Sequence, residues 1–276
     1  MATLQTQGIS LYYETYGDRS KRPVMLIAGL GGAGASWGAQ TARFAEDYFV
    51  VVPDHRGTGR TTRAKDGYTI AQHAADMAAL VEHLELGPTH IVGTSTGGAI
   101  GQLMALDHAG TVRTVTMASS FARADDYFRR EFVLRRKLVA ESDPQTIFNC
   151  YALFLFSPRY ISKNPERVAA WVERASGSHP FEREIALKRI DMILAHDALS
   201  RLGGIRQPVL VLCGDHDFCA PPHLSEEIVQ AIPGTHLVTF EGSGHFIDIE
   251  QEERFFKTVR SFIDRQSAAA AEEAAA

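Results

Sequence analysis

The sequence has few of the features that mark secreted or membrane proteins. Only three cysteines occur in 276 residues, at positions 150, 213 and 219. Their odd number and the lack of a C-x-x-C pair argue against a disulfide framework or a thiolate metal site, and Cys213 lies in an apolar run typical of a core. No stretch approaches 18 consecutive apolar residues, and the first residues lack a basic start followed by an apolar segment. We therefore expect a cytoplasmic protein.

An excess of positive charge is also lacking. The chain has 28 basic and 33 acidic side chains, a net charge of −5, and no basic run of the kind that nucleic-acid binders use. Apolar residues make up 45% and charged residues 22%, which is ordinary for a globular protein long enough to bury a large core. We expect a small-molecule substrate, no nucleic acid or membrane partner, and a monomer or homodimer.

The most informative stretch is residues 89–109. A short apolar run, His90 to Val92, meets Gly93-Thr-Ser95-Thr-Gly97, and a helical pattern follows at once. A serine between two glycines at a strand-to-helix turn has its hydroxyl exposed at the carboxyl end of the strand, beside the first helical amides. This G-x-S-x-G context favours a nucleophile, with a purely structural turn as the alternative.

Strand and helix patterns alternate on both sides of this turn. Continuous apolar runs, typical of strands covered on both faces, alternate with amphipathic helices, and a partly alternating, aromatic run precedes them. The expected strands are 9–16 (an antiparallel edge strand or a two-stranded hairpin), 23–28, 48–53, 90–92, 112–118, 207–214 and 236–240, and the clearest helices are 69–86, 224–232 and 250–265. This order predicts an α/β protein with a doubly wound, mostly parallel sheet, whose ligand site lies at the carboxyl ends of the strands.

Residues 121–203 interrupt the alternation. Helical patterns cover 123–137, 146–156, 165–174 and 181–202, and no strand pattern occurs among them. We interpret this segment as a helical cap inserted after the sixth strand, between the two parts of the core, 1–120 and 204–266. Residues 267–276 lack apolar periodicity and are expected to form a disordered or frayed tail.

Two groups of residues in the cap have two interpretations each. The aromatic side chains of Tyr151 and Phe154 either line a substrate pocket or simply pack the cap against the core. Arg129, Arg130, Arg135 and Arg136 are expected to form a solvated face, unless one of them points into the cleft and favours an acidic substrate.

A glycine-rich loop, residues 29–34, follows the strand that begins at Pro23. It lacks the spacing of a phosphate-binding loop, and the dinucleotide interpretation is weak. We favour a loop that approaches the substrate and supplies a backbone amide to developing negative charge. The amides of Leu30 and Thr96 are the expected oxyanion donors.

A serine nucleophile requires a base, and the base requires an orienting acid. Asp217 follows the strand that ends at Gly214, and His245 lies in a glycine-flanked loop after the last strand. The order Ser95, Asp217, His245 is that of the G-x-S-x-G hydrolases. His55, next to Asp54, is expected to form a turn, and a metal site at His216, Asp217 and His223 has no helix-spaced pair to support it.

The blocks Gly93-Thr-Ser-Thr-Gly-Gly, Asp54-His-Arg-Gly-Thr-Gly, Gly214-Asp-His-Asp-Phe-Cys-Ala-Pro and Gly242-Ser-Gly-His resemble those of the α/β-hydrolase superfamily, over nearly the whole chain. Residues 27–37, 54–62 and 68–72 resemble the aminoacrylate hydrolases of pyrimidine degradation and the 3-oxoadipate enol-lactonase group. The His-Gly pair that commonly opens the oxyanion loop is Ala28-Gly29 here, which leaves backbone donation intact, and Ser95 favours ordinary serine hydrolysis.

These observations predict a serine hydrolase that cleaves a small carboxylic ester or lactone, without cofactor or metal. The same residues also suit cleavage of a carbon–carbon bond in a β-diketone or dienoate, or of an enamine or amide C–N bond. A binding protein on a hydrolase fold is the remaining alternative. Candidate substrate contacts are Gly29, Trp37, Tyr151, Phe154, Phe218 and Phe246.

Overall fold

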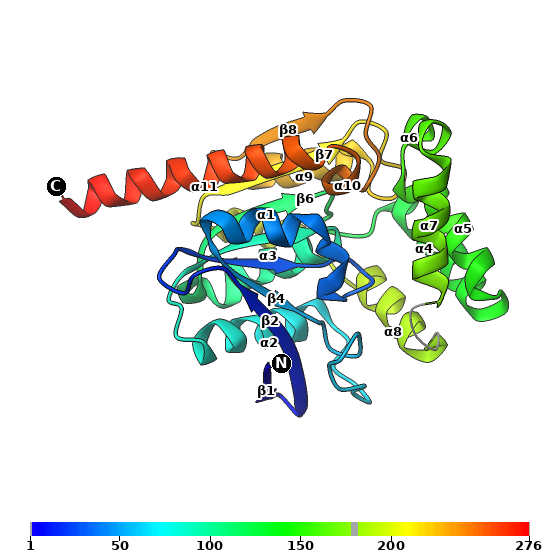
Figure 1. The fold of residues 1–276 in the computed structure, drawn as a ribbon, viewed down its shortest axis with the longest axis horizontal. Coiled ribbons are helices and arrows are strands. Elements are labelled where there is room, and N and C mark those ends of the chain that lie inside the picture. Colours follow the sequence, from blue (N-terminus) through cyan, green and yellow to red (C-terminus); the bar gives the residue numbers. More distant parts are fainter. Residues whose placement is uncertain (1, 178–181, 276) are drawn as a thin grey trace.

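Eight strands form one sheet in the order β1-β2-β4-β3-β5-β6-β7-β8 (Figure 1). The strands are β1 (Ala2–Thr6), β2 (Ile9–Tyr16), β3 (Pro23–Ile27), β4 (Phe49–Pro53), β5 (Thr89–Thr94), β6 (Val112–Ala118), β7 (Val209–Gly214) and β8 (His236–Phe240). This computed structural model describes residues 2–177 and 182–275. Residues 1, 178–181 and 276 lie outside it, and with them the first residue of the predicted core, the start of the helix predicted at 181 and the last residue of the predicted tail.

The direction of the strands determines where the functional loops meet. β2 pairs antiparallel with β1 and with β4, whereas the pairs from β4 to β8 are parallel. The carboxyl ends of β3, β5, β6, β7 and β8 therefore lie along the same edge of the sheet. The predicted mostly parallel, doubly wound α/β sheet is confirmed.

Helices cover both faces of the sheet. On one face α2 (Ile70–His83), α3 (Thr96–Asp107) and α9 (Pro222–Ala231) pack on side chains such as Met25, Ile27 and Ile91. On the other face α1 (Ala39–Asp47) and α11 (Glu252–Ala275) pack on alternate residues of the same strands, among them Val24 and Leu26. Alternation of side chains along buried strands places each residue on one of these two layers. Cys213 is fully buried on β7, as predicted.

A helical insert follows β6 and precedes β7. It contains α4 (Asp126–Glu141), α5 (Pro144–Leu155), α6 (Pro158–Lys163), α7 (Pro165–Gly177) and α8 (Arg183–Leu194), followed by the short 3-10 helix η3 (Leu199–Gly204). Side chains of Asp125, Asp143 and Ser157 accept backbone hydrogen bonds at the starts of α4, α5 and α6, which fixes these boundaries. Figure 1 shows the insert, in green and yellow-green, beyond the edge where the parallel strands end.

Three elements differ from the sequence prediction. The edge strand β1 and the helix α1 were not predicted, because β1 is half exposed and α1 is short. The alanine-rich segment from Ser267 continues α11 to Ala275 rather than ending near residue 265. Alanine has the highest helix propensity, so this segment extends the helix without an apolar face.

None of the helices in the two described ranges is both long enough and apolar enough to cross a membrane.

Very close backbone packing surrounds the turn between β5 and α3. A Cβ atom added to Gly97 would collide with the carbonyl oxygen of Ile27 on β3, and one added to Gly93 would collide with the carbonyl oxygen of Gly97. The helix start therefore lies directly against two strands. Only glycine fits at these two positions, because any side chain would push α3 away from the sheet.

Gly97→Ala should therefore destabilise the fold by about 1–3 kcal/mol, the usual cost of overpacking a rigid site. Gly110→Ala is the matched control, because a Cβ atom there meets nothing within 4 Å. Urea denaturation of the two variants measures the difference. Identical midpoints would show that the sheet accommodates the extra methyl group.

Candidate active site

Ser95 stands at the turn between β5 and α3 in a strained conformation, with φ 53° and ψ −118°. A positive φ is unfavourable for a residue with a side chain and persists only where surrounding contacts enforce it. Here the Ser95 amide donates to the Ala118 carbonyl at 2.8 Å, and the Ser120 hydroxyl donates to the Ser95 carbonyl at 2.8 Å. Both contacts come from the end of β6, so two adjacent strands hold the serine in place.

Asp217 and His245 form a buried pair. Nδ1 of His245 lies 2.8 Å from Oδ2 of Asp217, and the two residues are 5% and 2% exposed. The other carboxylate oxygen of Asp217 accepts the amides of Cys219 at 2.9 Å and Ala220 at 2.8 Å. An ionised Asp217 accepts the Nδ1 proton, which leaves Nε2 of a neutral His245 as the proton acceptor.

Backbone hydrogen bonds connect the loops that carry these residues. Beyond the ends of the strands, the Ser119 amide donates to Leu212 at 2.7 Å and the His216 amide donates to Ser243 at 2.9 Å. Together with the Ser95–Ala118 bond, they join the loops after β5, β6, β7 and β8 in order along the sheet edge. Ser95, Asp217 and His245 thus all stand just beyond the carboxyl ends of neighbouring parallel strands.

The helical insert holds the His245 loop from the other side. The Phe246 amide donates to the Leu155 carbonyl at 3.1 Å. The Glu250 carboxylate accepts both the amide and the hydroxyl of Ser157 at 2.7 Å, and the amide of Gly244 at 3.2 Å. The loop is therefore fixed between β8 and the α5–α6 junction.

Electrostatics around His245 favour its protonated form. Burial lowers the pKa of this imidazole, but the Asp217 carboxylate and the Cys219 thiol outweigh burial and raise the pKa well above its ordinary value. Two more carboxyls, Glu131 and Asp248, feel the charge of His245, and burial raises their pKa values to about 7 and about 6. The imidazole is therefore a stronger base than a histidine in water.

The glycine-rich loop lies against the serine. A Cβ atom added to Gly29 would stand 3.3 Å from the Ser95 Cβ, which is a close contact. Thr96 is the first residue of α3, so its amide has no acceptor within the helix and points toward the region in front of the helix N-terminus. The helix dipole adds partial positive charge there. Gly29 and Thr96 therefore border the serine, and the oxyanion roles of the Leu30 and Thr96 amides stay a prediction.

The expected solvated arginine face on α4 needs one correction. Arg129, Arg130 and Arg136 are exposed, but Arg135 is only 3% exposed and forms an ion pair with the buried Glu131, Nε to Oε1, at 2.9 Å. Its guanidinium stacks over the rings of Tyr151 at 4.5 Å and Phe154 at 5.3 Å. The helical period explains the difference, because residue 135 shares the inward face of α4 with 131 and 128.

The predicted aromatic contacts fall into different places. Phe246 follows His245, with ring centroids 6.0 Å apart, and packs on Phe156 of the insert. Phe218 is 41% exposed at the surface of the loop after β7. Trp37, expected to contact substrate, is instead a core residue: it is 3% exposed and packs on Phe255 of α11.

No group of three or more histidine, cysteine, aspartate or glutamate side chains in the described residues is arranged to hold a metal ion. The residues considered for such a site point to separate partners. His216 contacts Asp215 at 2.9 Å, and His223 contacts Asp125 at 2.7 Å, while Asp217 binds His245.

Sequence reasoning missed three residues around the site. Glu131 and Cys219 lie close enough to His245 to alter or feel its charge. Arg189 of α8 donates to the carbonyl of Leu30 in the glycine-rich loop at 2.7 Å. Glu131 and Arg189 reach the site only through the packing of the insert on the core, so no spacing rule identifies them. Cys219 lies in the loop after β7, two residues from Asp217, and that proximity was the signal that could have found it.

Comparison with known proteins agrees with this architecture. The chain is 32% identical to a protein of Caulobacter vibrioides named "Putative carbamate hydrolase RutD", over 92% of this chain and 95% of the relative. The structure of the present chain matches the enol-lactonase of Burkholderia xenovorans LB400 with a TM-score of 0.86 and 26% identity, over 95% of this chain and 100% of the enol-lactonase. It matches a thermophilic esterase of Thermogutta terrifontis with a TM-score of 0.82 and 25% identity, over 96% and 97%.

A family model described as alpha/beta hydrolase fold matches residues 22–251, which include the strained serine, the acid–histidine pair and the helical insert. The chain belongs to the α/β-hydrolase family.

Proposed function

We propose that this hydrolase cleaves a small carboxylic ester or lactone through an acyl-enzyme, with Ser95, His245 and Asp217 as its catalytic triad. The observation that carries the proposal is the buried 2.8 Å contact between His245 and Asp217, at the same sheet edge as the strained Ser95. A base oriented by an acid beside a serine at a sharp turn is the arrangement that serine hydrolysis requires.

In the first step the Ser95 hydroxyl oxygen attacks the carbonyl carbon of the substrate, and Nε2 of His245 takes its proton. The carbonyl oxygen becomes an oxyanion, which the amides of Leu30 and Thr96 stabilise. The tetrahedral intermediate then collapses. The imidazolium gives its proton to the leaving alkoxide, and the acyl group stays on Ser95.

In the second step His245 takes a proton from a water molecule, whose oxygen attacks the acyl carbon. The intermediate releases the carboxylic acid, and Ser95 regains its proton from the imidazolium. Asp217 remains ionised throughout and stabilises the charged imidazole. Its two amide donors, from Cys219 and Ala220, support this role because they hold the carboxylate in place against the imidazole.

The substrate class has two supports. The structural relatives named enol-lactonase and esterase act on carboxylic esters by their names. Near Glu131, which feels the charge of His245, the insert places the rings of Tyr151 and Phe154 against the guanidinium of Arg135. Glu131 pairs with that guanidinium, so these rings are the apolar surface that the insert offers to a small acyl group.

A carbamate is the second candidate substrate, because a relative that covers 92% of this chain is named a carbamate hydrolase. The same three residues serve for it. Ser95 would attack the carbamate carbonyl, and His245 would protonate the departing group.

Ser95→Ala should lower kcat by about 10⁴-fold or more, because the nucleophile acts as one unit with its base. The variant should also lose covalent labelling by a fluorophosphonate probe, which reacts with activated serines. Ser261→Ala, at an exposed serine on α11, is the matched control. Full activity in Ser95→Ala, or labelling at another residue, would contradict the proposed nucleophile, and an unlabelled wild-type protein would favour a binding function.

A substrate panel separates the candidate reactions. We expect turnover of p-nitrophenyl acetate, p-nitrophenyl butyrate and an enol-lactone, with the acid product identified by mass spectrometry. The panel also contains an alkyl carbamate, an enamine and a β-diketone. Cleavage of the carbamate or of one of the other two compounds, without cleavage of any ester or lactone, would replace the ester assignment.

The pH dependence of kcat/KM should follow His245, which must be neutral to accept a proton. Because its pKa is raised above the ordinary 6.5, the rising limb should lie above that value. Asp217→Asn removes the carboxylate that raises the pKa and leaves burial, which lowers it. The limb should therefore move to lower pH in the variant, while the maximal rate falls by about 10⁴-fold.

The measurement is kcat/KM for p-nitrophenyl butyrate between pH 5 and pH 10. Because kcat/KM reports the ionisations of the free enzyme, a fit to its rising limb gives the pKa in each protein. Glu131, Asp248 and Cys219 also face the imidazole, so Glu131→Gln serves as the control for their influence. A limb that moves to higher pH in Asp217→Asn would contradict the assigned acid.

A further inference from the structure

We propose that Arg189, on helix α8 of the insert, is a positioning residue that holds the oxyanion loop in its productive conformation. This inference rests on the proposed function, since it assigns Arg189 a role through the amide of Leu30. Arg189 lies in the insert, whereas the loop belongs to the core, so the contact joins the two parts of the chain at the site.

The guanidinium of Arg189 is buried and makes hydrogen bonds in three directions. The residue is 3% exposed. Nε donates to the Leu30 carbonyl at 2.7 Å, and Nη1 donates to the Arg56 carbonyl at 3.2 Å. Nη2 donates to Nδ1 of His55 at 3.1 Å. A planar fork with fixed donor directions determines the position of all three acceptors at once.

Two histidines act as neutral acceptors for this cation. His73 is bound through Nδ1 to the Thr69 carbonyl at 2.9 Å, so its Nε2, 3.5 Å from Nη1 of Arg189, carries the lone pair. Burial and the charge of Arg189 lower the pKa of His73 to about 3 and hold the pKa of His55 well below its ordinary value. Both rings therefore stay uncharged and accept hydrogen bonds at neutral pH.

Within the described ranges Arg189 forms no ion pair with a carboxylate. The buried Asp76 is taken by Arg56, which donates to it twice, at 3.0 and 2.8 Å. Burying a cation without an opposite charge is costly, and an apolar side chain would fill the same space at lower cost. Packing alone thus gives no reason for an arginine here, whereas fixing backbone carbonyls does.

The loop that Arg189 holds lies between the guanidinium and the nucleophile. Gly32 has φ +70°, its amide closes a turn on the Gly29 carbonyl at 2.9 Å, and a Cβ atom on it would stand 2.6 Å from Nη2 of Arg189. On the other side of the same turn, Gly29 faces Ser95. Leu30 is between these two glycines.

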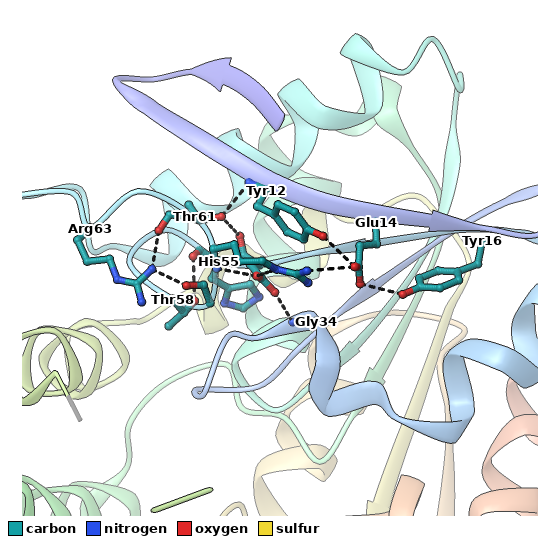
Figure 2. A network of polar contacts seen from close by, with 11 residues as sticks. Tyr12, Glu14, Tyr16, Gly34, His55, Thr58, Thr61 and Arg63 are labelled. Atoms are coloured by element: carbon teal, nitrogen blue, oxygen red, sulfur yellow. Dashed lines mark hydrogen bonds and ion pairs between the residues drawn. The ribbon is translucent and has the colours of Figure 1, made fainter. Parts of the chain in front are cut away.

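His55, the core residue that accepts a hydrogen bond from Arg189, is itself fixed by hydrogen bonds. His55 donates its amide to the Gly32 carbonyl at 2.8 Å, and its own carbonyl accepts the Thr58 hydroxyl at 2.8 Å. Figure 2 shows His55 and Thr58 in the network of the loop after β4, which also includes Thr61 of the same loop and Gly34 of the glycine-rich loop. His55 thus forms part of a turn, as its sequence predicts, and in addition supports Arg189.

A glycine-rich loop has many accessible conformations, so its amide stays aligned only where contacts restrict it. Displacement of a catalytic group by about 1 Å can lower a rate about 100-fold, and loss of one oxyanion donor about 100- to 1000-fold. Arg189 should accordingly act on the transition state rather than on substrate binding. Its removal should lower kcat more than it changes KM.

The test compares Arg189→Met, Arg189→Lys and Arg189→Gly with the control Arg136→Met. Arg136 also links α4 to α8, through Asp191 at 2.7 Å, but on the exposed side of the insert. On p-nitrophenyl butyrate, Arg189→Met should lose about 10- to 100-fold in kcat, with KM changed less than about threefold. Arg189→Lys keeps the charge without the fork and should lose a similar factor, and added guanidinium should raise kcat of Arg189→Gly. Arg136→Met should match the wild type.

Unchanged kcat in a folded Arg189→Met or Arg189→Lys variant, with only a lower melting temperature, would overturn the inference in favour of a purely structural role. If Arg189→Met does not fold, Arg189→Lys and Arg189→Gly provide the test. The inference is then overturned if Arg189→Lys has the kcat of the wild type and added guanidinium does not raise kcat of Arg189→Gly. Ser95→Ala in the same assay separates the two proposals. Retained activity there rejects the proposed function, whereas loss there with a normal Arg189→Met rejects only the role of Arg189.

Discussion

The contact of α3 with the sheet at Gly93 and Gly97 is the constraint on which the rest of the site depends. It forces the chain to reverse within a few residues and leaves Ser95 at positive φ, which surrounding strands enforce through hydrogen bonds from the end of β6. Strain at this residue is offset by the packing of a whole helix. The same parallel arrangement brings the loops after β7 and β8 to that edge, so the acid–histidine pair follows from topology rather than from any local contact.

Two opposing effects act on the pKa of His245. Burial alone would make the imidazole a weak base, and the Asp217 carboxylate more than reverses this. Burial also raises the pKa of the Glu131 carboxyl to about 7, so this group need not carry a full negative charge near neutral pH. The ion pair with Arg135 further lowers the free-energy cost of burying the Glu131 carboxyl. Burial in this way reduces the charge of the further carboxyls that surround the histidine, Glu131 and Asp248.

Local patterns predicted most of the fold and part of the site. Ser95 was found because a sharp strand-to-helix turn requires glycines next to it. Asp217 and His245 were found because each follows an apolar strand. The shared catalytic role of the three residues stays a prediction. The helical insert was predicted because it lacks strand patterns. Arg135 was expected in a solvated face, although the helical period groups it with the buried Phe128 and Glu131. Arg189 was overlooked, because its contacts depend on how a cap helix docks on the core. Docking is a long-range property that no short pattern encodes.

The hydrogen bond from Phe246 to Leu155 has a consequence for how the enzyme works through its cycle. The backbone next to His245, the proposed general base, is attached to the insert, and so is the carboxylate of Glu250 through Ser157. Lifting the insert far enough to admit a substrate by that route would pull on the loop that holds the imidazole. With His245 as the proposed base, such an open form would be catalytically incompetent, and entry and chemistry would then take place in alternation rather than together.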